Sequence, residues 1–285
     1  MSLSINQFIQ ALRLKEVAIL SGFFMIGSAF GIHTIDSHEI VKLGLVLFIS
    51  TGIVSSLYSL NAYTDNVKDE INPRLDSLKK VSRQFFLWYF IVSLPVFLAC
   101  SFTFHYDFGL LTSVLALVGT LYSLPRFGLK NNPLLGTVAH FLFSVTAFNA
   151  GYAAFQDISL DSFYLSCYFG LIFSGGHLHH QVIDYESDLK SSVKTLAVWW
   201  GVARTEFGSL ILFTLAAVVW IGSLYQGRIG KEEFVPLFVA YLIQATTFIR
   251  YRNGSYQDRI DYRSGYRFLY LSAFVLVAVL RLWKL

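Results

Sequence analysis

The chain has 285 residues, of which 55% are hydrophobic, 17% are aromatic and only 14% are charged, and its mean hydropathy is +0.55. Soluble domains carry charged side chains at about a quarter of their positions, so this composition excludes an ordinary soluble domain and predicts a polytopic membrane protein. The net charge of +4 comes from basic residues in short connections between apolar runs, which is typical of membrane topology, so we expect no nucleic-acid partner.

Nine apolar stretches are long enough to cross a bilayer as helices, because a span needs about 20 residues. No low-complexity segment or linker divides the chain, so the sequence predicts a single domain over residues 1–285. The expected fold is all-α, a polytopic bundle of nine transmembrane helices around a central cavity. The expected spans are residues 17–35, 40–63, 85–105, 108–124, 134–155, 162–182, 205–226, 234–251 and 266–283.

Lysine and arginine residues are divided unequally between the two sides of this expected bundle. Seventeen of the 22 fall on the side of the N-terminus and five on the other side. The positive-inside rule therefore predicts a cytoplasmic N-terminus and an outside C-terminus. The chain shows no leader rich in arginine and serine, so we expect the inner (cell) membrane of a prokaryote.

Two groups of acidic residues lie at the ends of apolar stretches on the predicted cytoplasmic side. Asn61, Asp65 and Asp69 recur every four residues after the second span, and Asp184 and Asp188 do so after the sixth. A helix would place each group on one face. Such clusters can hold Mg²⁺ ions that complete their coordination with phosphate oxygens, so a diphosphate is the expected ligand. The positions of the two groups also predict two related halves of about four helices each.

Basic residues occupy neighbouring connections on the same side and can pair with the charge of a diphosphate. Taken alone, Asp65 and Asp69 could equally begin a solvated loop beside Lys68 and Arg74, and the second acidic pair favours the metal site. The candidate basic residues are Arg74, Arg126, Lys130, Lys190 and Lys194.

Three histidines precede the second acidic pair. In a helix, His177, His180 or Gln181, and Asp184 share a face, so we expect a cavity wall or an acceptor contact there. Structural hydrogen bonding is the alternative, and a transition-metal site is the least favoured one. Residues 250–267, rich in arginine and tyrosine, are expected to form a solvated loop at the lipid surface, or else to cap the active site.

These spaced motifs resemble the signatures of the UbiA superfamily of intramembrane prenyltransferases. The first signature, N-D-x-x-D-x-x-x-D, is matched at Asn61, Asp65 and Asp69, with Ala62 in place of the usual aspartate. The R-P dipeptide that commonly follows is missing. The second signature is D-x-x-x-D followed by a small pair and K-T, and it is matched by Asp184, Asp188, Ser191, Ser192, Lys194 and Thr195, with Ser192 where glycine is usual. The Y-S-x-P...L-K element between the two signatures is matched by Tyr122, Ser123, Pro125, Arg126 and Lys130.

The resemblance implies a prenyltransferase that ionises an isoprenyl diphosphate with Mg²⁺ and lets a small lipophilic or aromatic acceptor attack the allylic cation in the membrane. It implies metal binding by Asn61, Asp65, Asp69, Asp184 and Asp188, of which the four aspartates are catalytic. Diphosphate binding falls to Arg74, Tyr122, Arg126, Lys130, Lys190 and Lys194. A membrane terpene cyclase without an acceptor is the close alternative, and a carrier for an anionic lipid or metabolite is the third.

Overall fold

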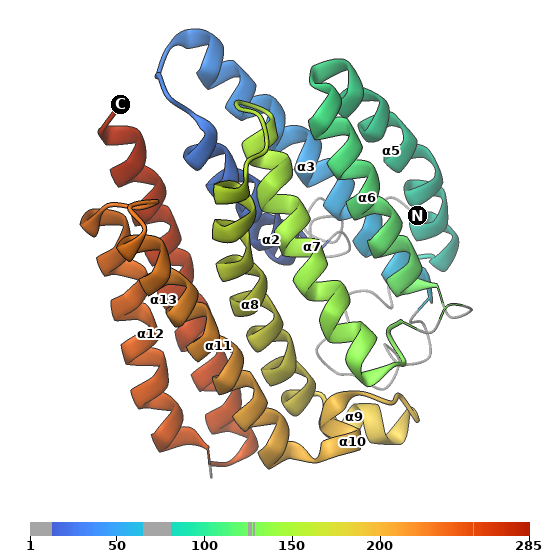
Figure 1. Cartoon of the computed structure of the whole chain (residues 1–285). Helices are drawn as coiled ribbons and strands as arrows, with labels where there is room; N and C mark the ends of the chain where they lie inside the picture. The colour runs from blue at the N-terminus through green and yellow to red at the C-terminus, as the bar shows by residue number, and fades with distance from the viewer. Residues whose placement is uncertain (1–12, 65–80, 125–126, 128, 253) are drawn as a thin grey trace.

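The computed structural model describes residues 13–64, 81–124, 127, 129–252 and 254–285, and every regular element in these ranges is a helix. Figure 1 shows the long helices side by side in one bundle, with two short helices across one end. The long helices are α2 (Leu14–Gly31), α3 (Ser37–Thr64), α5 (Arg83–Phe104), α6 (Tyr106–Ser123), α7 (Pro133–Ala153), α8 (Leu160–Ile183), α11 (Val202–Tyr225), α12 (Lys231–Tyr251) and α13 (Tyr256–Trp283). The short ones are α9 (Tyr185–Lys190) and α10 (Leu196–Trp200).

Within the described ranges, seven helices are long and apolar enough to cross a membrane, namely α3, α5, α6, α7, α11, α12 and α13. Helices α2 and α8 lie where spans were expected but fall short of that standard. In α8 the reason is composition, since three histidines and a glutamine stand among its last seven residues. The all-α, multi-pass membrane architecture is confirmed, and the number of nine spans stays a prediction.

Helix α2 lies inside the bundle, where it packs against α3, α7, α8 and α13. Its crossing with α7 is unusually close because a glycine of each helix faces the backbone of the other helix. A Cβ atom on Gly27 would lie 2.0 Å from the carbonyl oxygen of Phe148, and one on Gly151 would lie 1.9 Å from that of Phe24. Ser28 adds a hydrogen bond across the crossing, from Oγ to the carbonyl oxygen of Gly151 at 3.1 Å. Small residues at membrane helix contacts allow such backbone approach, so this crossing fixes α2 in the centre.

The expectation of a solvated loop over residues 250–267 is wrong for most of that segment, because α13 begins at Tyr256. Ser255 and Asp258 form a capping box in which the Ser255 amide donates to Asp258 Oδ2 at 2.7 Å. Tyr262 and Tyr266 are both buried on the inner face of the helix. The capped start and the four-residue spacing of the tyrosines therefore extend α13 ten residues before the predicted span.

The end of the bundle away from α9 and α10 is held by a buried carboxylate. Glu233 is 2% exposed and accepts from the Gly230 amide at 2.6 Å. It also lies 3.7 Å from Arg281 and 3.4 Å from Lys284 at the end of α13. Arg281 in turn lies over the ring of Phe30 on α2, so these ion pairs join α12, α13 and α2.

Candidate active site

The residues predicted to do chemistry gather at one end of the bundle. The ends of α3, α6 and α8, the start of α7 and the short helices α9 and α10 lie together there, in the lower part of Figure 1. Asn61 lies in the last turn of α3, and Asp184 directly follows α8. Asn61 of the first motif and Asp184 of the second therefore lie at the same end of the bundle, at the ends of different helices.

Asp184 and Asp188 stand one helical turn apart, as predicted. Asp184 joins α8 to α9, and the amides of Asp184 and Asp188 donate to the carbonyl oxygens of His180 and Asp184, at 3.0 and 2.8 Å. The helical bonding pattern thus runs through the junction and keeps both carboxylates on one face. Asp188 is only 1% exposed, and a carboxylate at such a position is costly unless cations or hydrogen bonds offset its charge.

The polar face predicted on α8 consists of two adjacent pairs. The Nε2 atom of His180 lies 3.4 Å from Oδ2 of Asp184, so this histidine leans toward the acidic pair. The Nε2 atom of His177 lies 2.7 Å from the side-chain nitrogen of Gln181. The backbone amide of Leu196 donates to Gln181 Oε1 at 2.9 Å, so the chain after the second motif folds back onto α8.

His140 on α7 belongs to this site, although the sequence reasoning did not select it. Its ring stacks on that of His177, with centroids 3.5 Å apart and an angle of 15° between planes. It also makes an edge contact with Tyr122 on α6, at 5.1 Å between centroids. His140 could have been selected from the sequence because it stands within an apolar span, and polar residues at membrane depth are rare and usually functional.

Asn61 and Lys130 bring the first motif to the same place. The ammonium group of Lys130 donates to Oδ1 of Asn61 at 3.4 Å and interacts electrostatically with His140. Through His140, these two residues are connected to Tyr122 and His177. The structure therefore brings together candidates from α3, α6, α8 and the connection before α7, which lie far apart in the sequence.

Other predicted site residues are not tested by these contacts. Lys190 and Lys194 are exposed, and no side-chain hydrogen bond or ion pair of either is seen among the described residues. Their binding of a diphosphate stays a prediction. Asp65, Asp69, Arg74 and Arg126 lie outside the described residues, so their roles also stay predictions.

The donor atoms that are described fit a hard cation such as Mg²⁺, which prefers carboxylate and amide oxygens. Asp184, Asp188 and Asn61 supply such oxygens at the same end of the bundle. Among the residues that the structure describes, no three His, Cys, Asp or Glu side chains form a metal-binding group by themselves. Metal binding by these residues together with Asp65 and Asp69 of the first motif therefore stays a prediction.

The tip of the second motif has a backbone conformation that favours glycine. Ser192 has a φ angle of 56°, in the left-handed region, and the next amide, that of Val193, donates to the carbonyl oxygen of Asp188 at 2.9 Å. Thr195 then begins α10 by accepting from the Val198 amide. The serine where the resembled family has glycine thus occupies a strained turn directly behind Asp188.

Replacing Ser192 with glycine is expected to raise the free energy of unfolding by up to about 1 kcal/mol, because glycine adopts a positive φ without steric cost. Thermal unfolding of the purified protein in detergent measures this change. Ser191→Gly is the matched control, since Ser191 has a φ of −90° and its hydroxyl donates to the Ser187 carbonyl oxygen at 2.7 Å. The control should be less stable than the parent, and equal melting temperatures for the two variants would contradict the strain.

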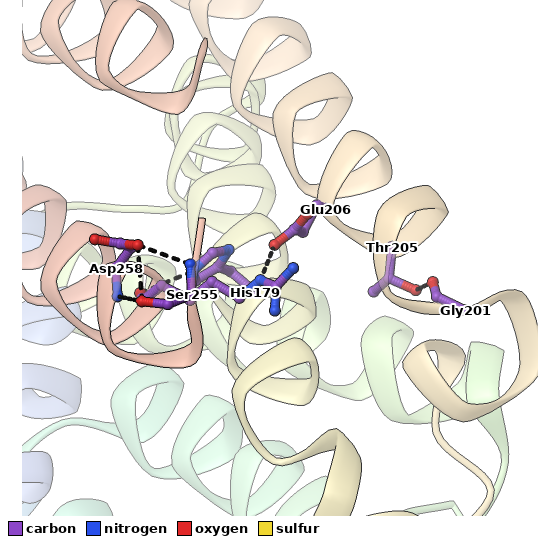
Figure 2. Close-up of polar contacts among 7 residues, drawn as sticks. His179, Gly201, Thr205, Glu206, Ser255 and Asp258 are labelled. Atoms are coloured by element: carbon purple, nitrogen blue, oxygen red, sulfur yellow. Dashed lines mark hydrogen bonds and ion pairs between the residues drawn. The ribbon is translucent and has the colours of Figure 1, made fainter. Parts of the chain in front are cut away.

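The third histidine of α8 has a structural role. Figure 2 shows His179 and Glu206 near Ser255 and Asp258 at the start of α13. His179 Nε2 donates to the carbonyl oxygen of Arg259 at 3.2 Å, and Arg259 Nε donates to Glu206 Oε1 at 2.7 Å. Ser209 Oγ donates to the Gly175 carbonyl oxygen at 2.7 Å, where α8 and α11 are in close contact. These bonds hold the polar end of α8 against α11 and α13.

Comparison with known proteins agrees with this picture. The sequence model of the UbiA prenyltransferase family matches residues 20–283. No curated protein sequence matches the chain.

Three solved structures illustrate the likeness of fold. A UbiA homolog from Archaeoglobus fulgidus bound to DMAPP and Mg²⁺ has a TM-score of 0.76 at 17% identity, covering 94% of this chain and 99% of that one. A digeranylgeranylglyceryl phosphate synthase has a TM-score of 0.73 at 17% identity, covering 99% of both chains. The apo structure of a UbiA homolog from Aeropyrum pernix K1 has a TM-score of 0.68 at 13% identity, covering 93% of this chain and 96% of that one.

Proposed function

The chain belongs to the UbiA prenyltransferase family, and from this premise we propose that it transfers the prenyl group of an isoprenyl diphosphate to a small lipophilic or aromatic acceptor in the membrane. One observation carries this proposal. Asp188, buried at the end of the bundle, follows Asp184 by one turn, and Asn61 with Lys130 approaches the same end from α3 and the start of α7. Carboxylates and a lysine at one membrane surface suit a metal-bound diphosphate.

The residues divide into two roles in this proposal. Asn61, Asp184 and Asp188, together with Asp65 and Asp69, would hold Mg²⁺, which when bound supplies Lewis-acid stabilisation of the charge on a departing diphosphate. The UbiA homolog from Archaeoglobus fulgidus, bound in separate structures to DMAPP and to GPP with Mg²⁺, supports this assignment by its likeness of fold. The residues proposed to bind the diphosphate are Lys130, Tyr122, Arg74, Arg126, Lys190 and Lys194.

Lys130 is the best supported of the diphosphate-binding residues. Its ammonium group already lies at the site, beside Asn61, and a cationic side chain there suits the negative charge of a diphosphate. Holding the leaving group in place while charge develops on it lowers the barrier to ionisation of the carbon–oxygen bond. The buried end of α8 excludes part of the water that would otherwise screen these charges.

The proposed orientation follows from charge. Among the described residues, the end of the bundle that holds the site carries most of the lysine and arginine residues, so the N-terminus and the site would face the cytoplasm of a prokaryotic cell membrane. We also propose one domain built of two related halves, because the two acidic motifs end helices in corresponding positions, α3 and α8.

An assay of diphosphate release by the purified protein in detergent tests this function. The donors are geranyl, farnesyl and geranylgeranyl diphosphate. Release should require Mg²⁺, stop on addition of EDTA, and fall by roughly 100-fold in Asp184→Asn, because one carboxylate of the metal site becomes a neutral amide. Asp157→Asn, an exposed position at the far end of the bundle, should match the parent protein.

Mass spectrometry of the organic extract then distinguishes the possible reactions. A prenylated acceptor, formed when candidate acceptors are added, identifies a transferase, whereas a cyclic hydrocarbon formed from the donor alone identifies a terpene cyclase. If the protein moves the prenyl diphosphate across the membrane of proteoliposomes but releases no free diphosphate in the presence of acceptors and Mg²⁺, it is a carrier and not an enzyme.

A further inference from the structure

The stacked histidines on α7 and α8 form a second polar centre within the site, about 10 Å along α8 from Asp184, since His177 precedes Asp184 by seven residues at about 1.5 Å per residue. The acidic motifs do not include these histidines. Their hydrogen bonds show which ring nitrogen carries the proton when each histidine is neutral. That assignment in turn shows which nitrogen can accept a proton.

The Nδ1 atom of His140 lies 2.8 Å from the carbonyl oxygen of Gly136, one turn earlier on α7. A carbonyl oxygen only accepts hydrogen bonds, so Nδ1 carries the proton and donates it. In the neutral ring, Nε2 then carries a lone pair. Because Nδ1 points back at its own helix, Nε2 points away from the α7 backbone.

His177 is held as an acceptor by a similar argument. The amide of Leu196 can only donate, so the atom of Gln181 that it meets, at 2.9 Å, is the side-chain oxygen. The other end of the Gln181 amide is therefore its NH₂ group, and it donates to His177 Nε2 at 2.7 Å. His177 accordingly accepts at Nε2 and is neutral in this arrangement.

Charge on one ring opposes charge on the other. The two imidazoles overlap at 3.5 Å between centroids, so two imidazolium ions would repel each other strongly at membrane depth. The nearby Lys130 ammonium adds to this repulsion. The pair therefore begins neutral and can accept one proton.

We propose that His140 is the proton acceptor of the reaction, a role that rests on the proposed prenyl transfer. After the allylic cation has formed and has been attacked, or has cyclised, a carbon–hydrogen bond of the cationic product breaks. Its electron pair forms a carbon–carbon double bond, and the proton passes to the Nε2 lone pair of His140. The proton then leaves His140 for water or for the diphosphate product, which restores the neutral ring.

Lys130 connects this step to binding of the donor. It interacts with His140 and, in the proposed function, with the diphosphate. A bound diphosphate offsets the positive charge of Lys130, so His140 accepts a proton more readily when the donor is present. Proton removal would thus follow, rather than precede, occupation of the diphosphate site.

The products made from farnesyl diphosphate alone test this role without knowledge of the acceptor. An allylic cation that loses a proton to a base gives a hydrocarbon, whereas one captured by water gives an alcohol. His140→Phe keeps an aromatic ring against His177 and Tyr122 but removes the lone pair. The ratio of hydrocarbon to alcohol should fall by about 100-fold, the lower end of the range of general-base effects, while diphosphate release, which precedes the proton transfer, should fall much less than in Asp184→Asn.

His105→Phe is the matched control, because this exposed histidine lies at the far end of the bundle and should leave both quantities unchanged. An unchanged product ratio in His140→Phe would overturn the proposal. A loss of diphosphate release in that variant as large as in Asp184→Asn would also overturn it, since the ring would then serve ionisation or folding.

A second measurement does not depend on turnover. Nitrogen-15 NMR of histidine-labelled protein at pH 7 should show His140 and His177 neutral and protonated at Nδ1, with signals assigned by His140→Phe and His177→Phe. An imidazolium signal for either residue would overturn the proposal even if the enzyme is active. If the parent protein releases no diphosphate under any condition, the proposed function fails, and neutral rings in the NMR spectrum then show that the failure lies there.

Discussion

Replacing Asp188 with asparagine is expected to lower Mg²⁺-dependent diphosphate release by at least about 100-fold, the order of effect seen when one electrostatic contact to a developing charge is removed. Asp188 is 1% exposed and lies one turn beyond Asp184, so the nearly isosteric amide should keep the local packing while losing the negative charge. Release from farnesyl diphosphate, measured as inorganic phosphate after pyrophosphatase treatment, gives the rate.

The same variant should lose its thermal stabilisation by metal, which can be measured without turnover. A ligand that binds only the folded state at 100 times its Kd stabilises that state by about 2.7 kcal/mol. The melting temperature of the parent protein should therefore rise with Mg²⁺ and diphosphate, and that of Asp188→Asn should rise much less. Glu186→Gln is the matched control, because Glu186 is exposed on the same short helix. If Asp188→Asn is stabilised by metal as strongly as Glu186→Gln, Asp188 is not a metal ligand.

Replacing Gly151 with alanine is expected to lower the free energy of unfolding by about 3 kcal/mol, at the upper end of the usual cost of overpacking. The added methyl group would lie 1.9 Å from the backbone oxygen of Phe24, and backbone atoms cannot move aside as a flexible side chain can. Helix α2 would have to separate from α7, which also stretches the bond from Ser28 to the Gly151 carbonyl oxygen. Thermal unfolding of detergent-solubilised protein, with size-exclusion chromatography as a check of folding, measures the loss.

Gly22→Ala provides the control for this crossing. Gly22 also lies in α2, but a Cβ atom there would meet nothing within 4 Å, so the substitution tests helix propensity alone. Alanine at that position should be neutral or stabilising by up to about 1 kcal/mol. Equal melting temperatures for Gly22→Ala and Gly151→Ala would show that the α2–α7 contact does not need glycine.

The sequence was informative where a physical pattern is local. Composition alone identified a multi-pass membrane protein, and the expected spans fall on the long helices of the bundle, because each apolar run must satisfy its backbone hydrogen bonds within itself. The four-residue spacing of Asp184 and Asp188 placed them on one face, since helical periodicity is fixed by the backbone. The prediction from local features was wrong at residues 250–267. The many charged residues there indicated a loop, whereas the capping box at Ser255 begins a helix.

The sequence by itself thus determined the class of protein, the acidic motifs and the family signature, because each depends on neighbours in the chain or on total composition. Only the tertiary structure decided that His140 stacks on His177, that Lys130 reaches Asn61, and that Gly151 meets Phe24. Each of these pairs joins different parts of the bundle, so its distance depends on how the helices cross. Those crossings are set by side-chain packing and close backbone contact, which no local period of the sequence encodes.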